Sequence, residues 1–243
     1  MKNFLAIVFV IFAAIFFYLL LQTRGGLNSE FNRTTRFTLG KYSWARKIFQ
    51  LHNPGDARKY YLTGNGSLIV EIVTADGTAF SETMLNEFKA EVKRLIGREV
   101  EVFNEDRIGG GSLNNAEISE IIKTKRRRFL PGQPNLFIIY ASDYNFRGEE
   151  ASRALWEYGI LVSDQRATEL ATRYGTPKDK FLKSSLLHFF GKQMGLSNND
   201  NQSCVMYRKV AEVDMQGKVD PGFTTSEYCD SEIEELGVIK KSF

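Results

Sequence analysis

The residues best suited to chemistry lie near the C-terminal end of the sequence, around His188. Lys192 follows His188 after four residues, and Gly195 follows three residues later. Side chains four residues apart share one face of a helix, so two imidazoles at this spacing can bind one metal ion. The second position here holds a lysine, whose ammonium repels a divalent cation. The chain has only two histidines, His52 and His188, which excludes a centre built from three imidazoles.

The segment resembles the signature of the metzincin zinc peptidases, H-E-x-x-H-x-x-G-x-x-H followed by a turn that contains methionine. His188, Gly195 and Met206 occupy the positions of the first histidine, the glycine and the turn methionine. The resemblance extends over about residues 68–236 and is nearest to the matrixin and archaemetzincin types. It implies an α+β, metzincin-like zincin fold, in which a twisted mixed sheet lies above an active-site helix, followed by a Met-turn and a C-terminal helix.

Three positions of the signature have lost their chemistry. Phe189 replaces the glutamate that activates the metal-bound water, and it cannot accept a proton. Lys192 and Asn198 replace the second and third histidines. An amide oxygen such as that of Asn198 is a poor zinc ligand. We therefore expect no catalytic residue, no metal and no cofactor.

An improvised metal site is the alternative. Asp200 and Cys204 are nearby residues with better ligand chemistry, and they could join His188 in binding zinc. A simpler interpretation is that His188 and Met206 only fill the core.

The two cysteines, Cys204 and Cys229, are the whole thiol content of the chain. A disulfide between them would fit an oxidising, extracytoplasmic location. Two buried free thiols would fit the sequence nearly as well.

An uninterrupted apolar run from Phe4 to Leu21 contains no charge, glycine or proline. As a helix it would be long enough to cross a hydrocarbon core of about 30 Å. Because the run ends in bulky residues, it favours an uncleaved signal anchor over a cleaved signal peptide. We expect a single-pass membrane protein whose C-terminal domain is extracytoplasmic.

The remaining charge pattern offers no partner. With 32 basic and 29 acidic residues, the formal net charge is +3, too balanced to indicate nucleic acid. We expect a transmembrane segment at residues 1–24, a linker with a short helix at residues 25–60, and the metzincin-like domain at residues 61–243.

Hydrophobic periodicity predicts the elements of that domain. Strands are expected at residues 68–73, 99–103 and 136–140. A helix is expected between the cap Ser81 and Gly97, and another between Pro177, at its first position, and Gly195. Residues 154–162 are expected to form an edge strand, because Glu157 and Gly159 interrupt the apolar pattern.

Three functions follow as hypotheses. The first is a membrane-anchored, inactive metzincin-like domain that binds a peptide or protein along its edge strand, or has a structural role. The second is an active zinc-dependent peptidase with a non-standard metal site. The third is an unrelated α/β binding domain tethered to a membrane, in which His188 and Met206 need not approach each other.

Overall fold

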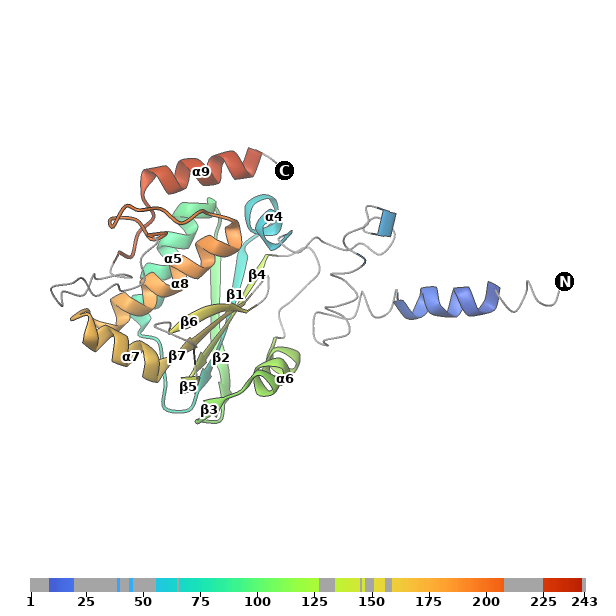
Figure 1. Cartoon of the computed structure of the whole chain (residues 1–243), viewed down its shortest axis with the longest axis horizontal. Helices are drawn as coiled ribbons and strands as arrows, with labels where there is room; N and C mark the ends of the chain where they lie inside the picture. Colours follow the sequence, from blue (N-terminus) through green and yellow to red (C-terminus); the bar gives the residue numbers. More distant parts are fainter. Residues whose placement is uncertain are drawn as a thin grey trace. The chain divides into compact units, whose positions relative to one another are not determined.

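The computed structural model describes residues 9–19, 39, 44–45, 56–64, 66–126, 134–144, 146, 151–155, 159–207 and 225–241 (Figure 1). The chain divides into two compact units. Residues 1–54 and 116–124 form the first unit, and residues 55–115 and 125–243 form the second. The second unit, here called the sheet domain, contains the residues of the metzincin-like signature.

The sheet domain is built on a five-stranded mixed sheet with the order β2-β1-β4-β7-β6. Its strands are β1 (Leu68–Ala75), β2 (Val100–Ile108), β4 (Asn135–Ala141), β6 (Ser152–Leu155) and β7 (Gly159–Ser163). The first four in the order are parallel, and β6 is antiparallel to β7. Two short strands, β3 (Ser112–Leu113) and β5 (Asp143–Tyr144), pair beside this sheet. The predicted mixed sheet is confirmed.

The strands β1, β4 and β7 are buried at every residue. This agrees with their sequences, which are nearly continuous apolar runs rather than alternating ones, as in parallel strands covered on both faces. The largest fully buried side chains include Tyr140, Phe137 and Ile138 of β4. The core therefore lies on the central strands of the sheet.

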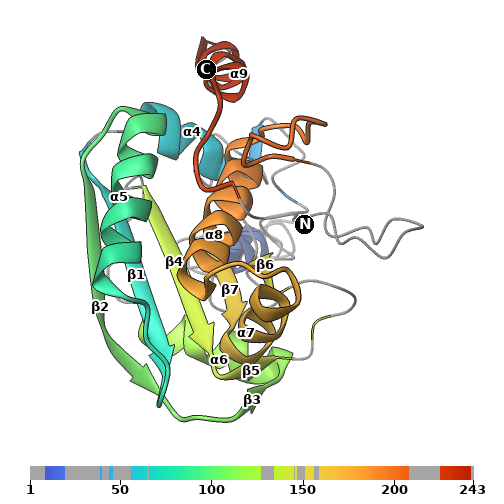
Figure 2. The same ribbon diagram turned by 90° about the vertical axis from the view of Figure 1, so that its left-hand side faces the viewer.

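Besides the helix at residues 9–19, the helices are α4 (Asp56–Thr63), α5 (Glu82–Ile96), α6 (Asn115–Lys125), α7 (Asp164–Arg173), α8 (Lys178–Met194) and α9 (Asp230–Lys241). In Figure 2, α5 and α8 cross one face of the sheet. The ends of α5 are those predicted: the Ser81 hydroxyl accepts a hydrogen bond from the Met84 N–H, and Gly97 is left-handed with φ +70°. These caps fix the residues at which α5 begins and ends.

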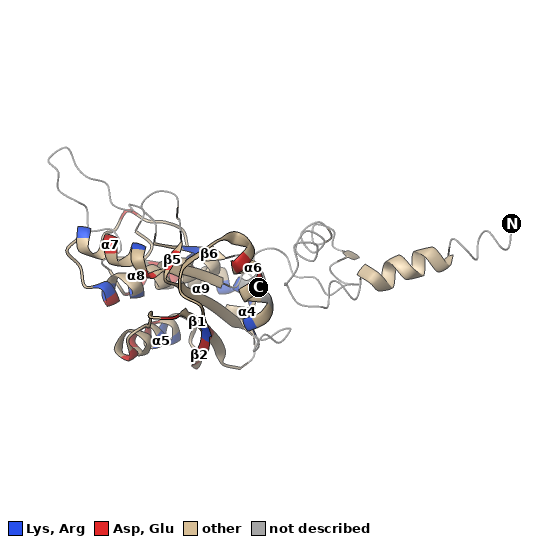
Figure 3. Cartoon of the chain, turned by 90° about the horizontal axis from the view of Figure 1, so that it is seen from below, with Lys and Arg blue, Asp and Glu red and all other residues tan. Residues whose placement is uncertain are grey.

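Basic and acidic residues are interspersed on the helices (Figure 3). Ion pairs link Lys183 to Glu87 at 2.6 Å and Arg166 to Glu169 at 3.0 Å. The described helices thus carry both signs of charge, in keeping with the balanced composition.

Two sequence predictions need correction, and one helix was missed. Residues 154–162 do not form one edge strand, because they contribute to both β6 and β7, and β7 lies inside the sheet between β4 and β6. The edge strand is β6. The helix α8 begins at Lys178, and Pro177 caps it instead of taking its first position. The helix α7, with its N-cap Ser163, was not predicted.

The N-terminal apolar run is described only in part. Residues 9–19 are helical, whereas residues 4–8 and 20–21 of the predicted span lie outside the described residues. Among the described residues, no helix has the length and apolar character needed to cross a membrane. Large apolar side chains of the described helix are exposed, including Phe9 at 72% and Phe12 at 68%.

Candidate functional site

The site is organised by α8 and by the turn that ends it. Gly195 has φ +88°, a left-handed conformation that glycine adopts readily. Its N–H donates to the Lys192 carbonyl, and the Leu196 N–H donates to the Gly191 carbonyl, each at 3.0 Å. This is a Schellman-type helix end, which satisfies carbonyl groups that would otherwise lack a partner. The chain can therefore reverse and return beneath the helix.

The returning segment meets α8 first at His188. Its imidazole is 6% exposed, and Nδ1 lies 2.9 Å from the carbonyl oxygen of Val205. Because a carbonyl oxygen only accepts, Nδ1 carries the hydrogen, and Nε2 of the neutral ring does not. The pKa of His188 is lowered from 6.5 to about 4, mainly by burial and also by the charge of Lys192, while the hydrogen bond to Val205 opposes the shift. The imidazole is therefore neutral at pH 7.

The second contact is between Met206 and Gly191. Met206 is fully buried, and a Cβ atom added to Gly191 would lie 2.5 Å from the Met206 Sδ. The absence of a side chain at Gly191 therefore lets the methionine lie directly against the helix, one turn beyond His188. The predicted Met-turn residue thus packs beneath the helix that carries His188. This approach favours the metzincin-like interpretation over an unrelated α/β domain.

The other signature positions are more exposed than His188. Phe189 and Lys192 are partly exposed, and Asn198 is exposed in the turn after the helix. The Phe189 ring stands edge-on to His188, with 5.5 Å between the ring centroids. Partial burial lowers the pKa of the Lys192 ammonium, which the charge of Glu235 opposes.

These residues do not fit a zinc ion of the metzincin type. His188 has the tautomer that a ligand needs, since metal-bound histidines commonly donate their other N–H to a carbonyl. However, the ammonium of Lys192 takes the place of the second ligand, and Phe189 supplies no proton acceptor. One imidazole with a cation beside it is a poor donor set for a divalent metal.

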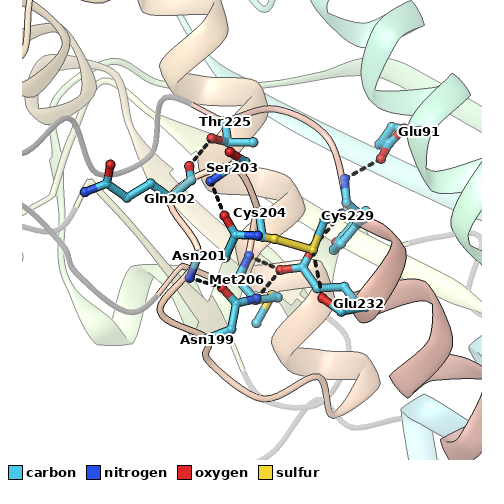
Figure 4. The surroundings of a disulfide bond; sticks show 12 residues. Glu91, Asn199, Asn201, Gln202, Ser203, Cys204, Met206, Thr225, Cys229 and Glu232 are labelled. Carbon is cyan, nitrogen blue, oxygen red and sulfur yellow. Dashed lines mark hydrogen bonds between the residues drawn. A yellow bond between two sulfur atoms is a disulfide. The ribbon is translucent and has the colours of Figure 1, made fainter.

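The improvised set of His188, Asp200 and Cys204 fares no better. The Sγ atoms of Cys204 and Cys229 form a disulfide (Figure 4). A disulfide sulfur is not a thiolate and does not serve as a zinc ligand in the usual way. Asp200 is exposed. The improvised site is therefore left with one buried imidazole.

Among the residues that the structure describes, one group of ligand types comes together, formed by Cys204, Cys229 and Glu232, whose ligand atoms all lie within 4.8 Å of one another. The Glu232 carboxylate is 1% exposed and already accepts three hydrogen bonds (Figure 4). The donors are the Met206 N–H at 2.7 Å, the Asn199 Nδ2 at 2.8 Å and the Cys229 N–H at 3.0 Å. In the disulfide form this carboxylate fixes the turn beneath α8.

A second buried carboxylate fastens the segment before α9. Glu91 of α5 accepts the Tyr228 N–H at 2.7 Å and the Arg94 guanidinium at 2.6 Å. The Tyr228 hydroxyl donates to the Leu187 carbonyl of α8, and complete burial raises the pKa of this phenol well above 10.0. The C-terminal segment is therefore bonded to both α5 and α8.

Comparison with known proteins gave distant structural similarities. No protein-family model and no curated protein matches the sequence. Archaemetzincin from Methanopyrus kandleri is 17% identical with a TM-score of 0.49, and the alignment covers 72% of this chain and 96% of that chain. Archaemetzincin from Archaeoglobus fulgidus is 14% identical with a TM-score of 0.41, covering 69% and 99%. A zinc-dependent peptidase from Methanocorpusculum labreanum is 10% identical with a TM-score of 0.45, again covering 69% and 99%. At these values, the chemistry has to be judged from the residues of this chain.

Sequence reasoning missed Gly191, Glu232 and Glu91 as parts of the site. Gly191 had a detectable signal, since glycine in a helix interior destabilises it unless a neighbour needs the space. Glu232 and Glu91 had none, because the partners that link them to other parts of the site, Met206 and Tyr228, are 26 and 137 residues away in the sequence.

Proposed function

We propose that this chain is a membrane-anchored, catalytically inactive metzincin-like domain that binds an extended peptide or protein segment. The observation that carries the proposal is the contact of Val205 and Met206 with α8 at His188 and Gly191. This contact holds the turn that contains Met206 against α8. Phe189, Lys192 and Asn198 stand where the metzincin signature has the glutamate and the second and third histidines.

The strand β6 supports peptide binding. One side of β6 pairs with β7, and no other strand among the described residues pairs with its outer side. A strand edge presents unpaired N–H and C=O groups that an added strand can satisfy. Its end residues, Ser152 and Leu155, are buried and the two residues between them are more exposed, so β6 is held in place at both ends.

Two features support the anchor and its orientation. The described helix at residues 9–19 exposes apolar side chains such as Val10, Ile11 and Phe17, which favour lipid over water. The Cys204–Cys229 disulfide is typical of a domain outside the cytoplasm. We accordingly place the sheet domain on the extracytoplasmic side.

The proposal is tested by restoring the missing chemistry. A triple variant carrying Phe189→Glu, Lys192→His and Asn198→His would regain the ligand set on the existing helix and turn. We expect about one zinc per chain in this variant and none in the unchanged protein, measured by elemental analysis. His188→Ala added to the triple variant is the control and should abolish binding. Stoichiometric zinc in the unchanged protein that is lost with His188→Ala would refute the proposal.

A second candidate is a metal-dependent peptidase with a non-standard centre, favoured by the proximity of Cys204, Cys229 and Glu232. It requires a reduced disulfide. Peptide hydrolysis that appears on reduction and is abolished by a chelator would support it, whereas hydrolysis absent under both conditions would exclude it.

A further inference from the structure

Lys192 differs from the other partly buried lysines of α8. Lys178 is paired with Asp164 and Lys183 with Glu87, each at 2.6 Å. Among the described residues, no carboxylate forms an ion pair with Lys192. The nearby Glu235 uses its Oε1 atom to accept the Ser197 N–H at 3.0 Å. Within the described part of the chain, Lys192 is therefore a partly desolvated cation that is not ion-paired, and such a group attracts an anion.

The face of α8 that carries Lys192 runs along β6. Ser185, His188 and Lys192 follow one another at spacings of three and four residues, which places them on one face of the helix. The Ser185 hydroxyl is hydrogen-bonded to the hydroxyl of Ser152, at the beginning of β6. Seven residues of helix span about 10 Å, roughly the length of a four-residue strand.

The last turn of α8 is fixed at the other end of β6. Gln193, next to Lys192, donates from Nε2 to the Gly159 carbonyl at 2.7 Å. Gly159 is the register partner of Leu155, the last residue of β6. The turn that carries Lys192 thus lies at the Leu155 end of the edge strand.

From these positions we infer that the peptide site ends at Lys192 and that its occupant is the C-terminal segment of a polypeptide, with the terminal carboxylate bound by the Lys192 ammonium. The inference rests on the proposed peptide-binding function. Since Lys192 lies at the Leu155 end, the bound segment runs in the same direction as β6. With only four residues, β6 offers few main-chain hydrogen bonds, and a charged contact at one end supplies affinity and fixes the register.

The experiment compares two pools of fluorescent octapeptides, identical except that one has a free C-terminal carboxylate and the other a C-terminal amide. Both pools lack Asp and Glu. Binding to the full chain in mild detergent is measured by fluorescence anisotropy. We expect the acid pool to bind about tenfold more tightly than the amide pool. Lys192→Gln should remove this difference, and Lys192→Arg should retain it.

The matched control is Lys180→Gln, on an exposed lysine of the same helix, which should leave the difference intact. Equal binding of the two pools would overturn the inference and leave the peptide-binding function standing. An amidated pool containing Asp and Glu whose binding depended on Lys192 would also overturn it, because the ligand would then be a side-chain carboxylate. Failure of every pool to bind would overturn the peptide-binding function itself.

Discussion

Two sides of α8 differ in burial and in packing. The side that meets Val205 and Met206 is buried, closely packed and hydrogen-bonded, and a single glycine sets its spacing. The adjoining open side, which carries Phe189 and Lys192 next to His188, is partly exposed. The contrast teaches that the fold depends on the packed side, whereas metal chemistry would depend on the open side. The packing beneath α8 can therefore be kept whichever residues the open side carries.

Loss of the buried carboxylate beneath α8 should have the largest effect. Glu232→Ala leaves the Met206 N–H, the Cys229 N–H and the Asn199 amide without their acceptor. Each unsatisfied buried donor costs about 1–3 kcal/mol, so the free energy of unfolding should fall by about 4 kcal/mol. Urea denaturation followed by circular dichroism measures it. Glu234→Ala, an exposed neighbour on α9, is the control, and an equal loss in both variants would contradict the assigned role.

Protonation of His188 should have the next largest effect. Burial lowers its pKa from 6.5 to about 4, so the unfolded chain binds a proton over this range that the folded chain does not. The stability from the neutral imidazole is complete above pH 6.5 and decreases as the pH falls toward 4. The decrease amounts to about 3 kcal/mol over this window. This contribution is measured by comparing the free energy of unfolding of the unchanged protein and of His188→Gln between pH 7 and 4. The same pH dependence in both proteins would show that His188 does not titrate in this way.

The packed side can be tested through a pair of helix glycines. Gly191→Ala places a Cβ atom 2.5 Å from the Met206 Sδ, whereas a Cβ atom at Gly237 of α9 meets nothing within 4 Å. We expect Gly191→Ala to destabilise by about 2 kcal/mol through overpacking and Gly237→Ala to stabilise by about 0.5 kcal/mol through helix propensity. Thermal unfolding of both variants gives the comparison. A stabilising Gly191→Ala would mean that Met206 does not lie against the helix.

Substitutions on the open side should change the free energy of unfolding least. Phe189→Leu and Lys192→Gln change partly exposed side chains, and we expect each to alter the free energy of unfolding by less than about 1 kcal/mol. The same denaturation assay checks this. A loss as large as that for Glu232→Ala would show that the open side also maintains the fold.

Local sequence signals predicted much of the architecture. The Ser81 cap, the Gly97 and Gly195 helix ends and the apolar strands depend on residues close together in the chain, so their patterns were readable. The division of residues 154–162 between two strands depends on which strands pair in the sheet, so it could not be predicted from the local sequence. The short helix α7 has mostly polar residues and only three buried ones, a weak periodic signal.

For the site, the sequence supplied only an argument about ligand chemistry, and the absence of zinc stays a prediction. The types of residues 189, 192 and 198 were enough to argue against a zinc centre, because ligand chemistry is a property of the side chain itself. The roles of Glu232 and Glu91 depend on contacts formed only in the folded chain. A buried glutamate that accepts main-chain N–H groups has no signature distinguishing it from an exposed glutamate on a helix.

The most direct test of the central claim is the zinc content of the unchanged chain, purified with zinc in the medium and measured by elemental analysis beside His188→Ala. If the packed side of α8 is kept without the metal chemistry, both proteins should contain no stoichiometric zinc. One zinc per chain in the unchanged protein, lost on His188→Ala, would contradict the account and show that the open side still holds a metal.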